Sequence, residues 1–284
     1  MTTKKSFFQT SDGVWLYYEV TGEGKPLVIL PGFSGTTEYF TDHVKAWSEK
    51  YTVVVMDPRS HGRSMKVAGS MRIERMAKDI RDLINHLDLH DVVLMGHSLG
   101  GAQVAHYVNH EDAYRLRGAG LIDATLYGFS DEPWNEHKCH GHNMDMWLQR
   151  MTPYMNDTKA YWEKALSPVK DKLPEEVYQK KLNDLCALPS WAGAEMHLSV
   201  YHTDNFTPLK NCTIPMAFFT AHSAYHNAWR SHHEAMERMD KSPLKCMYEF
   251  FSNDHGFPGS EKEKFINCVF DFMEKLDAFE REEK

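Results

Sequence analysis

The stretch that decides the fold is Val92-Val93-Leu94-Met95-Gly96-His97-Ser98-Leu99-Gly100-Gly101. Its apolar first half predicts a buried strand, and the segment after it, Ala102 to Val108, predicts a helix. Gly96, Ser98 and Gly100 form the pattern Gly-x-Ser-x-Gly, the sequence form of a nucleophile elbow that lifts a serine above the edge of a sheet. Small-residue turns also contain this pattern, but the strand before it and the helix after it favour the elbow. We interpret Ser98 as a catalytic nucleophile.

Short apolar runs alternate with helical segments on both sides of this stretch. The runs are Leu27–Leu30, Tyr51–Met56, Ala119–Asp123, Pro215–Thr220 and Cys246–Phe251. Such alternation predicts an α/β fold, a mostly parallel central sheet with helices on both faces. A hairpin is expected around Ser11-Asp12-Gly13. One helix is expected over 36–50, and a last amphipathic helix over 260–279, before a frayed charged tail.

The alternation stops between about residues 127 and 205. This part of the chain is rich in Trp, Met, His and Tyr, its pattern is mainly helical, and it contains no clear strand run. An insertion of this kind after a sheet strand commonly forms a lid over a site. We therefore expect a core made of 1–126 and 206–284, with a helical lid (cap) at 127–205.

The composition of the 284 residues is that of a globular protein, with 42% hydrophobic and 25% charged residues. A formal charge of −8 argues against nucleic acid or an anionic membrane surface as a partner. We see no signal peptide and no run long enough to span a membrane. Five scattered cysteines favour reduced thiols, so a cytoplasmic location is expected.

A serine hydroxyl needs an adjacent base before it becomes a good nucleophile, and seventeen histidines are available. His255 follows the last apolar run and precedes the last helix, which places it at the carboxyl edge of the expected sheet, where catalytic groups gather. The alternative interpretation is an exposed loop histidine. We take His255 as the general base.

The order of these motifs resembles the α/β-hydrolase fold superfamily over nearly the whole chain. The residues that carry the resemblance are Leu30-Pro31-Gly32-Phe33, the loop Asp57 to Ser64, Gly96 to Gly101, and Asp254-His255-Gly256. The loop resembles the pattern D-x-R-G-x-G-x-S of that family, although Ser60-His61-Gly62 departs from it. The resemblance implies a structural role for this loop.

The acidic partner of the histidine is not where many family members carry it. The matching stretch, 220–225, contains no Asp or Glu, and Ala224 stands about where the carboxylate would be. Asp123, at the end of the strand after the elbow helix, keeps the chain order Ser, Asp, His. Its alternative role is to cap a turn at the strand end. Asp254 is the other nearby acid, but adjacent side chains seldom point at each other, so we prefer Asp123.

An oxyanion hole needs two backbone N–H groups. One is expected from Leu99, directly after Ser98. The other, by resemblance to the H-G-x loop of the family, is that of Phe33. The usual histidine before the glycine is Pro31 here, which leaves the backbone donor intact but changes the support of the loop.

No cofactor and no metal are expected from the sequence. His137-Lys138-Cys139-His140-Gly141-His142 has the residue types of a metal site, but no second cluster completes a tetrahedral set. The pairs His222 and His226, and His232 and His233, are explained as surface helix positions.

The leading functional hypothesis is a serine hydrolase that cleaves a small apolar ester or lactone through an acyl-enzyme on Ser98. A carbon–carbon bond hydrolase could use the same residues. The cofactor-independent ring-cleaving dioxygenases of the hydroxyquinolone type also have a similar arrangement, but they typically carry a histidine after Pro-Gly, where this chain has Phe33. A binding module that keeps the pocket without catalysis, like some hormone receptors of this fold, is a further alternative.

Overall fold

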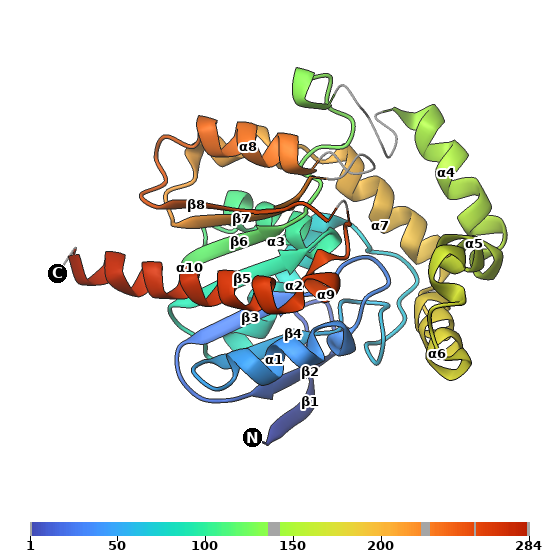
Figure 1. The fold of residues 1–284 in the computed structure, drawn as a ribbon, viewed down its shortest axis with the longest axis horizontal. Coiled ribbons are helices and arrows are strands. Elements are labelled where there is room, and N and C mark those ends of the chain that lie inside the picture. The colour runs from blue at the N-terminus through green and yellow to red at the C-terminus, as the bar shows by residue number, and fades with distance from the viewer. Residues whose placement is uncertain (1, 136–142, 223–227, 253, 283–284) are drawn as a thin grey trace.

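The computed structural model describes residues 2–135, 143–222, 228–252 and 254–282. Their secondary structure is an eight-stranded sheet with helices on both of its faces (Figure 1). The predicted α/β architecture is therefore confirmed. The four cysteines in these ranges are free thiols.

The strands lie in the order β1-β2-β4-β3-β5-β6-β7-β8. The hairpin β1–β2 and the pair β2–β4 are antiparallel, and every later neighbouring pair is parallel. The carboxyl ends of the parallel strands therefore meet at one edge of the sheet. The strands are β1 Thr3–Gln9, β2 Trp15–Thr21, β3 Pro26–Leu30, β4 Thr52–Met56, β5 Val92–His97, β6 Leu116–Ile122, β7 Met216–Ala221 and β8 Lys245–Phe250.

Each face of the sheet is covered by its own set of helices. The core on one face contains the buried side chains of α1 (Thr41–Trp47) and α10 (Lys262–Glu282), and the core on the other contains those of α2 (Ile73–His86), α3 (Leu99–His110) and α8 (Ala228–Arg238). The strands between them are apolar on both sides because both sides are buried.

Alternation along β7 shows how the two faces are separated. Phe218 belongs to the core on the α8 face, whereas Phe219 and Ala221 belong to the core on the α10 face. Since successive side chains point to opposite faces, Thr220 shares the face of Phe218. Glu249 of β8 is paired with Thr220 in register, so it faces α8 as well.

Two expected boundaries differ in the structure. The helix expected over 36–50 is divided into a 3₁₀ turn, η1 (Thr37–Phe40), and α1, and Thr36 caps the turn by accepting from the N–H of Glu38. The tail expected to be frayed continues α10 to Glu282. Glu280 forms ion pairs with Lys25 and Arg117, which hold that last helical turn against the body.

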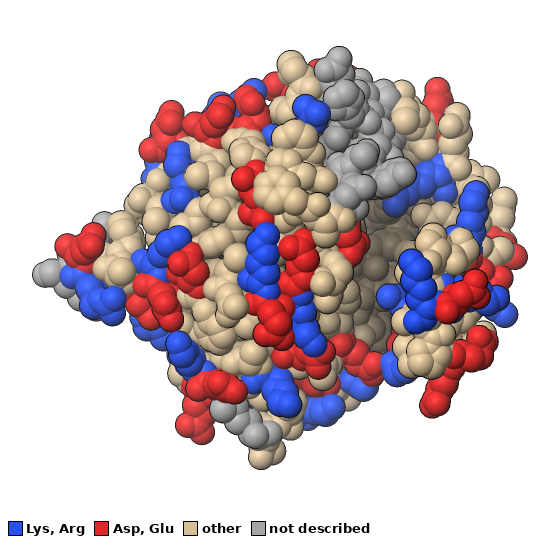
Figure 2. Space-filling view, in the orientation of Figure 1, with Lys and Arg blue, Asp and Glu red and all other residues tan. Residues whose placement is uncertain are grey.

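Four helices lie between β6 and β7: α4 (Met144–Asn156), α5 (Thr158–Lys170), α6 (Glu175–Cys186) and α7 (Ser190–His202). They project to one side of the sheet (Figure 1). The N–H of Asn205 donates to the carbonyl of Leu126 at 2.9 Å. The chain between these two residues, which contains the four helices, therefore begins and ends at the same place. The surface is hollowed between α5 and α6 and the rest of the molecule (Figure 2).

A helix that spans a membrane must be both long and apolar. Within the described ranges, no helix combines the length and the apolar character that crossing a bilayer needs.

Candidate functional site

Ser98 occupies a strained turn between β5 and α3. Its backbone has φ 55° and ψ −116°, a conformation that L residues rarely adopt and that requires support from the surroundings. A Cβ on Gly100 would lie 2.6 Å from the carbonyl oxygen of Leu30 and 2.7 Å from that of Pro31. A Cβ on Gly96 would lie 2.6 Å from the nitrogen of Gly101. Glycine at both positions is therefore a steric requirement of the elbow.

The loop after β3 lies directly against the elbow. Leu30 pairs with Gly96 in the parallel register, so Gly32 follows at the same sheet edge as Ser98. A Cβ added to Gly32 would be only 3.0 Å from the Cβ of Ser98. Phe33 comes next along this loop, and Leu99 begins α3, whose first N–H groups have no partner within the helix. The two expected oxyanion donors thus come from segments on either side of Ser98.

Asp123 and His255 are brought together at the same edge. Asp123 follows β6 with φ 46°, and its N–H donates to the carbonyl of Phe219 at 2.8 Å. The His255 Nδ1–H donates to Asp123 Oδ2 at 2.6 Å, and the N–H of Ala221 donates to Asp123 Oδ1 at 3.1 Å. The carboxylate is fully buried and the imidazole is 37% exposed. This pairing holds the imidazole with its proton on Nδ1, which leaves Nε2 as the basic nitrogen.

Asp254, the alternative acid, has different partners. Its Oδ1 accepts from the N–H of Gly256 at 2.8 Å, and its Oδ2 accepts from the hydroxyl of Ser260 at 2.7 Å. Its carboxylate therefore holds the turn that leads into α9 (Phe257–Ser260).

His97 links the elbow to the loop of His255. Because a carbonyl only accepts, the His97 Nε2–H donates to the His255 carbonyl, at 2.9 Å. The two imidazole rings lie 4.7 Å apart, and Tyr39 stacks on His97 at 5.2 Å. Burial lowers the pKa of His97 to about 3, so the ring stays neutral. His97 thus contacts the loop of His255, although in the sequence it is only the unspecified residue before the serine in Gly-x-Ser-x-Gly.

His61 supports the loop that carries Phe33. Its Nδ1–H donates to the carbonyl of Arg59 at 2.9 Å, which leaves Nε2 to accept the N–H of Ser34 at 3.2 Å. Burial lowers the pKa of His61 to about 4, so Nε2 remains an acceptor at neutral pH. This contact supports the loop in which Pro31 replaces the usual histidine. The only sequence signal for it is the departure Ser60-His61-Gly62 from the family pattern.

The rest of the Asp57 to Ser64 loop is held by its own polar side chains. Asp57 accepts the N–H groups of Thr37 at 2.6 Å and Arg63 at 2.8 Å. The fully buried Arg59 donates two hydrogen bonds of 2.6 Å to Asp79 on α2. These contacts agree with the structural role that the resemblance implies for the loop.

Aromatic side chains of α4, α5 and α7 lie against Phe33. Its ring centroid is 5.6 Å from that of Tyr154 on α4, 6.0 Å from that of Trp162 on α5 and 5.8 Å from that of His197 on α7. His197 accepts a hydrogen bond from the indole N–H of Trp147 at 3.1 Å, and burial lowers its pKa well below the usual value. The loop that carries Phe33 thus contacts three of the four helices between β6 and β7.

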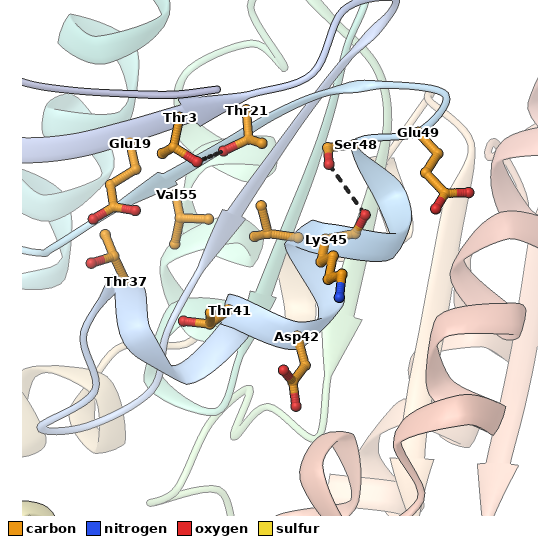
Figure 3. Close-up of a pocket in the computed structure, with 11 residues that line it drawn as sticks. Thr3, Glu19, Thr21, Thr37, Thr41, Asp42, Lys45, Ser48, Glu49 and Val55 are labelled. Atoms are coloured by element: carbon orange, nitrogen blue, oxygen red, sulfur yellow. Dashed lines mark hydrogen bonds between the residues drawn. The ribbon is translucent and has the colours of Figure 1, made fainter. Parts of the chain in front are cut away.

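A separate polar pocket of about 480 Å³ lies between α1 and the strands β1, β2 and β4 (Figure 3). Glu19, Asp42, Glu49 and Lys45 are among its lining residues, and Ser98, Asp123 and His255 are not. It is therefore a different place from the candidate active site.

The histidines for which the sequence predicts surface helix positions do not all occupy such positions. His137–His142, His226 and Ala224 lie outside the described residues. His232 is buried, and its Nε2–H donates to the carbonyl of Ala124 at 3.1 Å. His222 and His233 instead meet at Glu249, an arrangement that sequence spacing did not show.

Residues 25–160 match the family model described as alpha/beta hydrolase fold. Among curated proteins, a non-heme chloroperoxidase of Kitasatospora aureofaciens is 37% identical over 40% of this chain and 42% of its own length. A non-heme haloperoxidase of Rhodococcus erythropolis is 34% identical over 42% of this chain and 44% of its own length. The matched region therefore spans less than half the length of each of these relatives.

Solved structures are similar over almost the whole chain. An esterase from Exiguobacterium antarcticum has a TM-score of 0.82 at 21% identity, over 95% of this chain and 100% of its own. A bromoperoxidase from Bacillus anthracis has a TM-score of 0.81 at 19% identity, with the same coverage. An enol-lactonase from Burkholderia xenovorans LB400 has a TM-score of 0.77 at 17% identity, over 94% of this chain and 99% of its own. Identities this low show a common fold.

Proposed function

We propose that this chain, which belongs to the α/β-hydrolase fold superfamily, is a serine hydrolase with Ser98 as nucleophile, His255 as general base and Asp123 as the acid that holds the base. The observation that carries the proposal is the 2.6 Å hydrogen bond from His255 to the buried Asp123, at the sheet edge that carries the strained Ser98. The proposed substrate is a small apolar ester or lactone.

In the proposed reaction, His255 Nε2 takes the hydroxyl proton of Ser98 as its oxygen attacks the substrate carbonyl. Asp123 stabilises the imidazolium that forms. The backbone N–H groups of Phe33 and Leu99 bind the oxyanion of the tetrahedral intermediate. His255 then gives its proton to the departing alkoxide. In the second half of the reaction, His255 takes a proton from water as the water attacks the acyl-enzyme, and returns a proton to the Ser98 oxygen as the acid product leaves.

The apolar substrate class is supported by the surroundings of Phe33. Tyr154, Trp162 and His197 place three rings around the side chain next to a proposed oxyanion donor. Ligand pockets are mostly apolar with a few converging polar groups, and aromatic rings supply much of their contact area. We propose residues 127–205 as the lid that brings these rings to the site.

Labelling by a fluorophosphonate probe tests the nucleophile. Wild-type protein should be labelled and should hydrolyse p-nitrophenyl esters, whereas Ser98→Ala should do neither, because the probe forms its bond with the activated serine oxygen. Ser260→Ala is the matched control: it removes a hydroxyl close to the His255 loop and should be labelled like the wild type. Undiminished labelling of Ser98→Ala would contradict the proposal.

Oxygen uptake separates hydrolysis from the dioxygenase alternative. A hydroxyquinolone substrate should cause no oxygen consumption by wild-type protein if the site is hydrolytic. Oxygen consumption that survives in Ser98→Ala and is lost in an Asp123 variant would favour the dioxygenase.

The names of the matched relatives favour a second candidate reaction at the same site. Two of them are named non-heme chloroperoxidase and non-heme haloperoxidase. Hydrogen peroxide is a nucleophile like water, so its attack on the acyl-enzyme would release a peroxyacid and restore the Ser98 hydroxyl. Peroxyacid formation from an acetate ester and hydrogen peroxide, absent in Ser98→Ala, would establish this reaction.

A further inference from the structure

A cluster of two histidines and a glutamate stands apart from the proposed triad. His222 directly follows β7, His233 lies on α8, and Glu249 lies on β8. The face alternation described above places Glu249 on the α8 side of the sheet, and His222, two residues after Thr220, points the same way. Three separate elements thus contribute one side chain each.

The ligand atoms of this cluster are close together. His222 Nε2–H donates to Glu249 Oε1 at 2.7 Å, and His233 Nε2–H donates to the same oxygen at 2.9 Å. All three atoms lie within 4.8 Å of one another. Ligands at about 2.0–2.2 Å from a tetrahedral zinc ion are roughly 3.3–3.6 Å apart. Coordination therefore requires the two contacts with Glu249 Oε1 to lengthen by roughly 0.4–0.9 Å, which rotation of these partly exposed side chains can supply.

Aromatic rings fix the orientation of His222. Trp229 stacks on the imidazole at 4.7 Å with an interplanar angle of 19°, and Phe251 stacks on it at 4.6 Å with an angle of 28°. Trp229 also meets the ring of His233 edge-on at 6.2 Å. A ligand whose orientation is set by its neighbours loses less entropy on binding a metal.

The charges around the cluster favour an ionised carboxylate. Hydrogen bonds from His222 and His233 lower the pKa of Glu249, against the opposing effect of burial. The side chains are between 29% and 43% exposed, so an ion can reach them from solvent. Two cations near the cluster have partners other than the Glu249 carboxylate: Lys264 donates to the backbone carbonyl of Glu249 at 2.8 Å, and the Arg230 guanidinium lies over the Trp229 ring at 4.4 Å.

We propose that His222, His233 and Glu249 form a binding site for a divalent transition-metal ion, with Zn²⁺ as the probe. Two neutral imidazoles and one carboxylate are the donor set of open zinc sites, which leave a further position for water. On binding, the ion takes the place of the two protons now shared with Glu249, and these protons leave to the solvent or move to Nδ1. The ion ties α8 to the ends of β7 and β8.

Zinc content measured after dialysis and gel filtration tests the site. Wild-type protein should retain one equivalent more than His233→Asn or Glu249→Gln, each of which removes one ligand. Both positions are partly exposed, so these variants should keep the metal-free melting temperature. Because the chain also contains the histidine- and cysteine-rich stretch 137–142, the readout is the difference between wild type and variants rather than the total zinc content.

His90→Asn is the matched control, because His90 also pairs with a carboxylate, that of Asp88 at 3.2 Å, but within the described ranges this pair belongs to no group of three possible ligands. This variant should retain the zinc content of the wild type. Zinc should also raise the melting temperature of wild type and His90→Asn by mass action, with no such rise in Glu249→Gln. Equal zinc content and equal thermal response in all four proteins would overturn the proposal.

Discussion

At the scale of single residues, the pairing of Asp123 with His255 carries most of the functional argument. Asp123 accepts from Ala221 and from His255 through its two oxygens, whereas Asp254, next to the histidine in sequence, caps a turn with both of its oxygens. Adjacency in sequence therefore misleads here, because neighbouring side chains on a loop diverge. The two aspartates make a natural pair of test positions.

Asp123→Asn should lower the turnover of p-nitrophenyl esters by about two to four orders of magnitude. An amide in place of the carboxylate no longer stabilises the imidazolium and can favour the wrong imidazole tautomer. Steady-state kinetics measures the effect, with melting curves to verify that the variant is folded.

Asp254→Asn serves as the control, since the amide oxygen can still accept from the N–H of Gly256 and the amide nitrogen can donate to the hydroxyl of Ser260. Its turnover should stay within about threefold of the wild type, a difference below roughly 0.7 kcal/mol in the barrier. A fully active Asp123→Asn together with an impaired Asp254→Asn would reverse the assignment of the acid.

At the scale of elements, the strand β5, the helix α3 and the loop after β3 form one tightly packed unit. Gly96, Gly100 and Gly32 let the three backbones approach each other at the position where Ser98 is held with φ 55°. The first turn of α3 then lies at the sheet edge with its N–H groups free to face the site. The geometry of the elbow is therefore a property of the packing between these elements rather than of Ser98 alone.

Gly100→Ala should destabilise the protein and lower the rate of fluorophosphonate labelling. The new methyl group would overlap the carbonyl oxygens of Leu30 and Pro31, which belong to backbone and cannot move aside easily. Overpacking of this kind costs about 1–3 kcal/mol of unfolding free energy, measured by urea denaturation.

The comparison variant is Gly259→Ala, on the short helix α9 near the His255 loop. A Cβ at this glycine meets no atom within 4 Å, so stability and labelling should match the wild type. Equal stability of the two variants would show that the elbow relaxes more freely than its packing indicates.

At the scale of the whole molecule, buried neutral histidines couple folding to pH. Burial lowers the pKa of His61 to about 4 and that of His97 to about 3, from an ordinary value of 6.5. Between pH 6.5 and 4 the unfolded chain therefore binds more protons than the native protein at these two positions. Their contribution to stability is complete above pH 6.5 and is lost as the pH falls toward 4.

The free energy of unfolding, measured by urea denaturation at several pH values, should therefore decrease from pH 7 to pH 5. His61→Gln should reduce this slope by roughly 1.4 kcal/mol per pH unit, because one proton fewer is taken up on unfolding. The absolute stability of the variant also changes, so the slope is the quantity to compare.

His90→Gln should retain the slope of the wild type, because the His90 side chain is 61% exposed in the folded protein. If His61→Gln and His90→Gln had the same effect on the slope, protonation of buried His61 would not be a source of acid sensitivity.

The amino-acid sequence by itself determined the α/β fold and indicated which edge of the sheet would carry the site. Apolar runs of strand length, alternating with helical segments, have few other ways to bury both faces of a sheet, and the elbow pattern requires a strand before it and a helix after it. Ser98, Asp123 and His255 each follow a strand at its carboxyl end, and this placement predicts that they share one edge of the sheet.

Only the tertiary structure decided which side chains meet at that edge. Asp123 reaches His255 and Asp254 does not, His61 supports the loop of Phe33, and Glu249 lies between His222 and His233. These contacts join residues from different elements, and each depends on register and side-chain rotamers, whereas sequence periodicity reports only the face on which a residue lies.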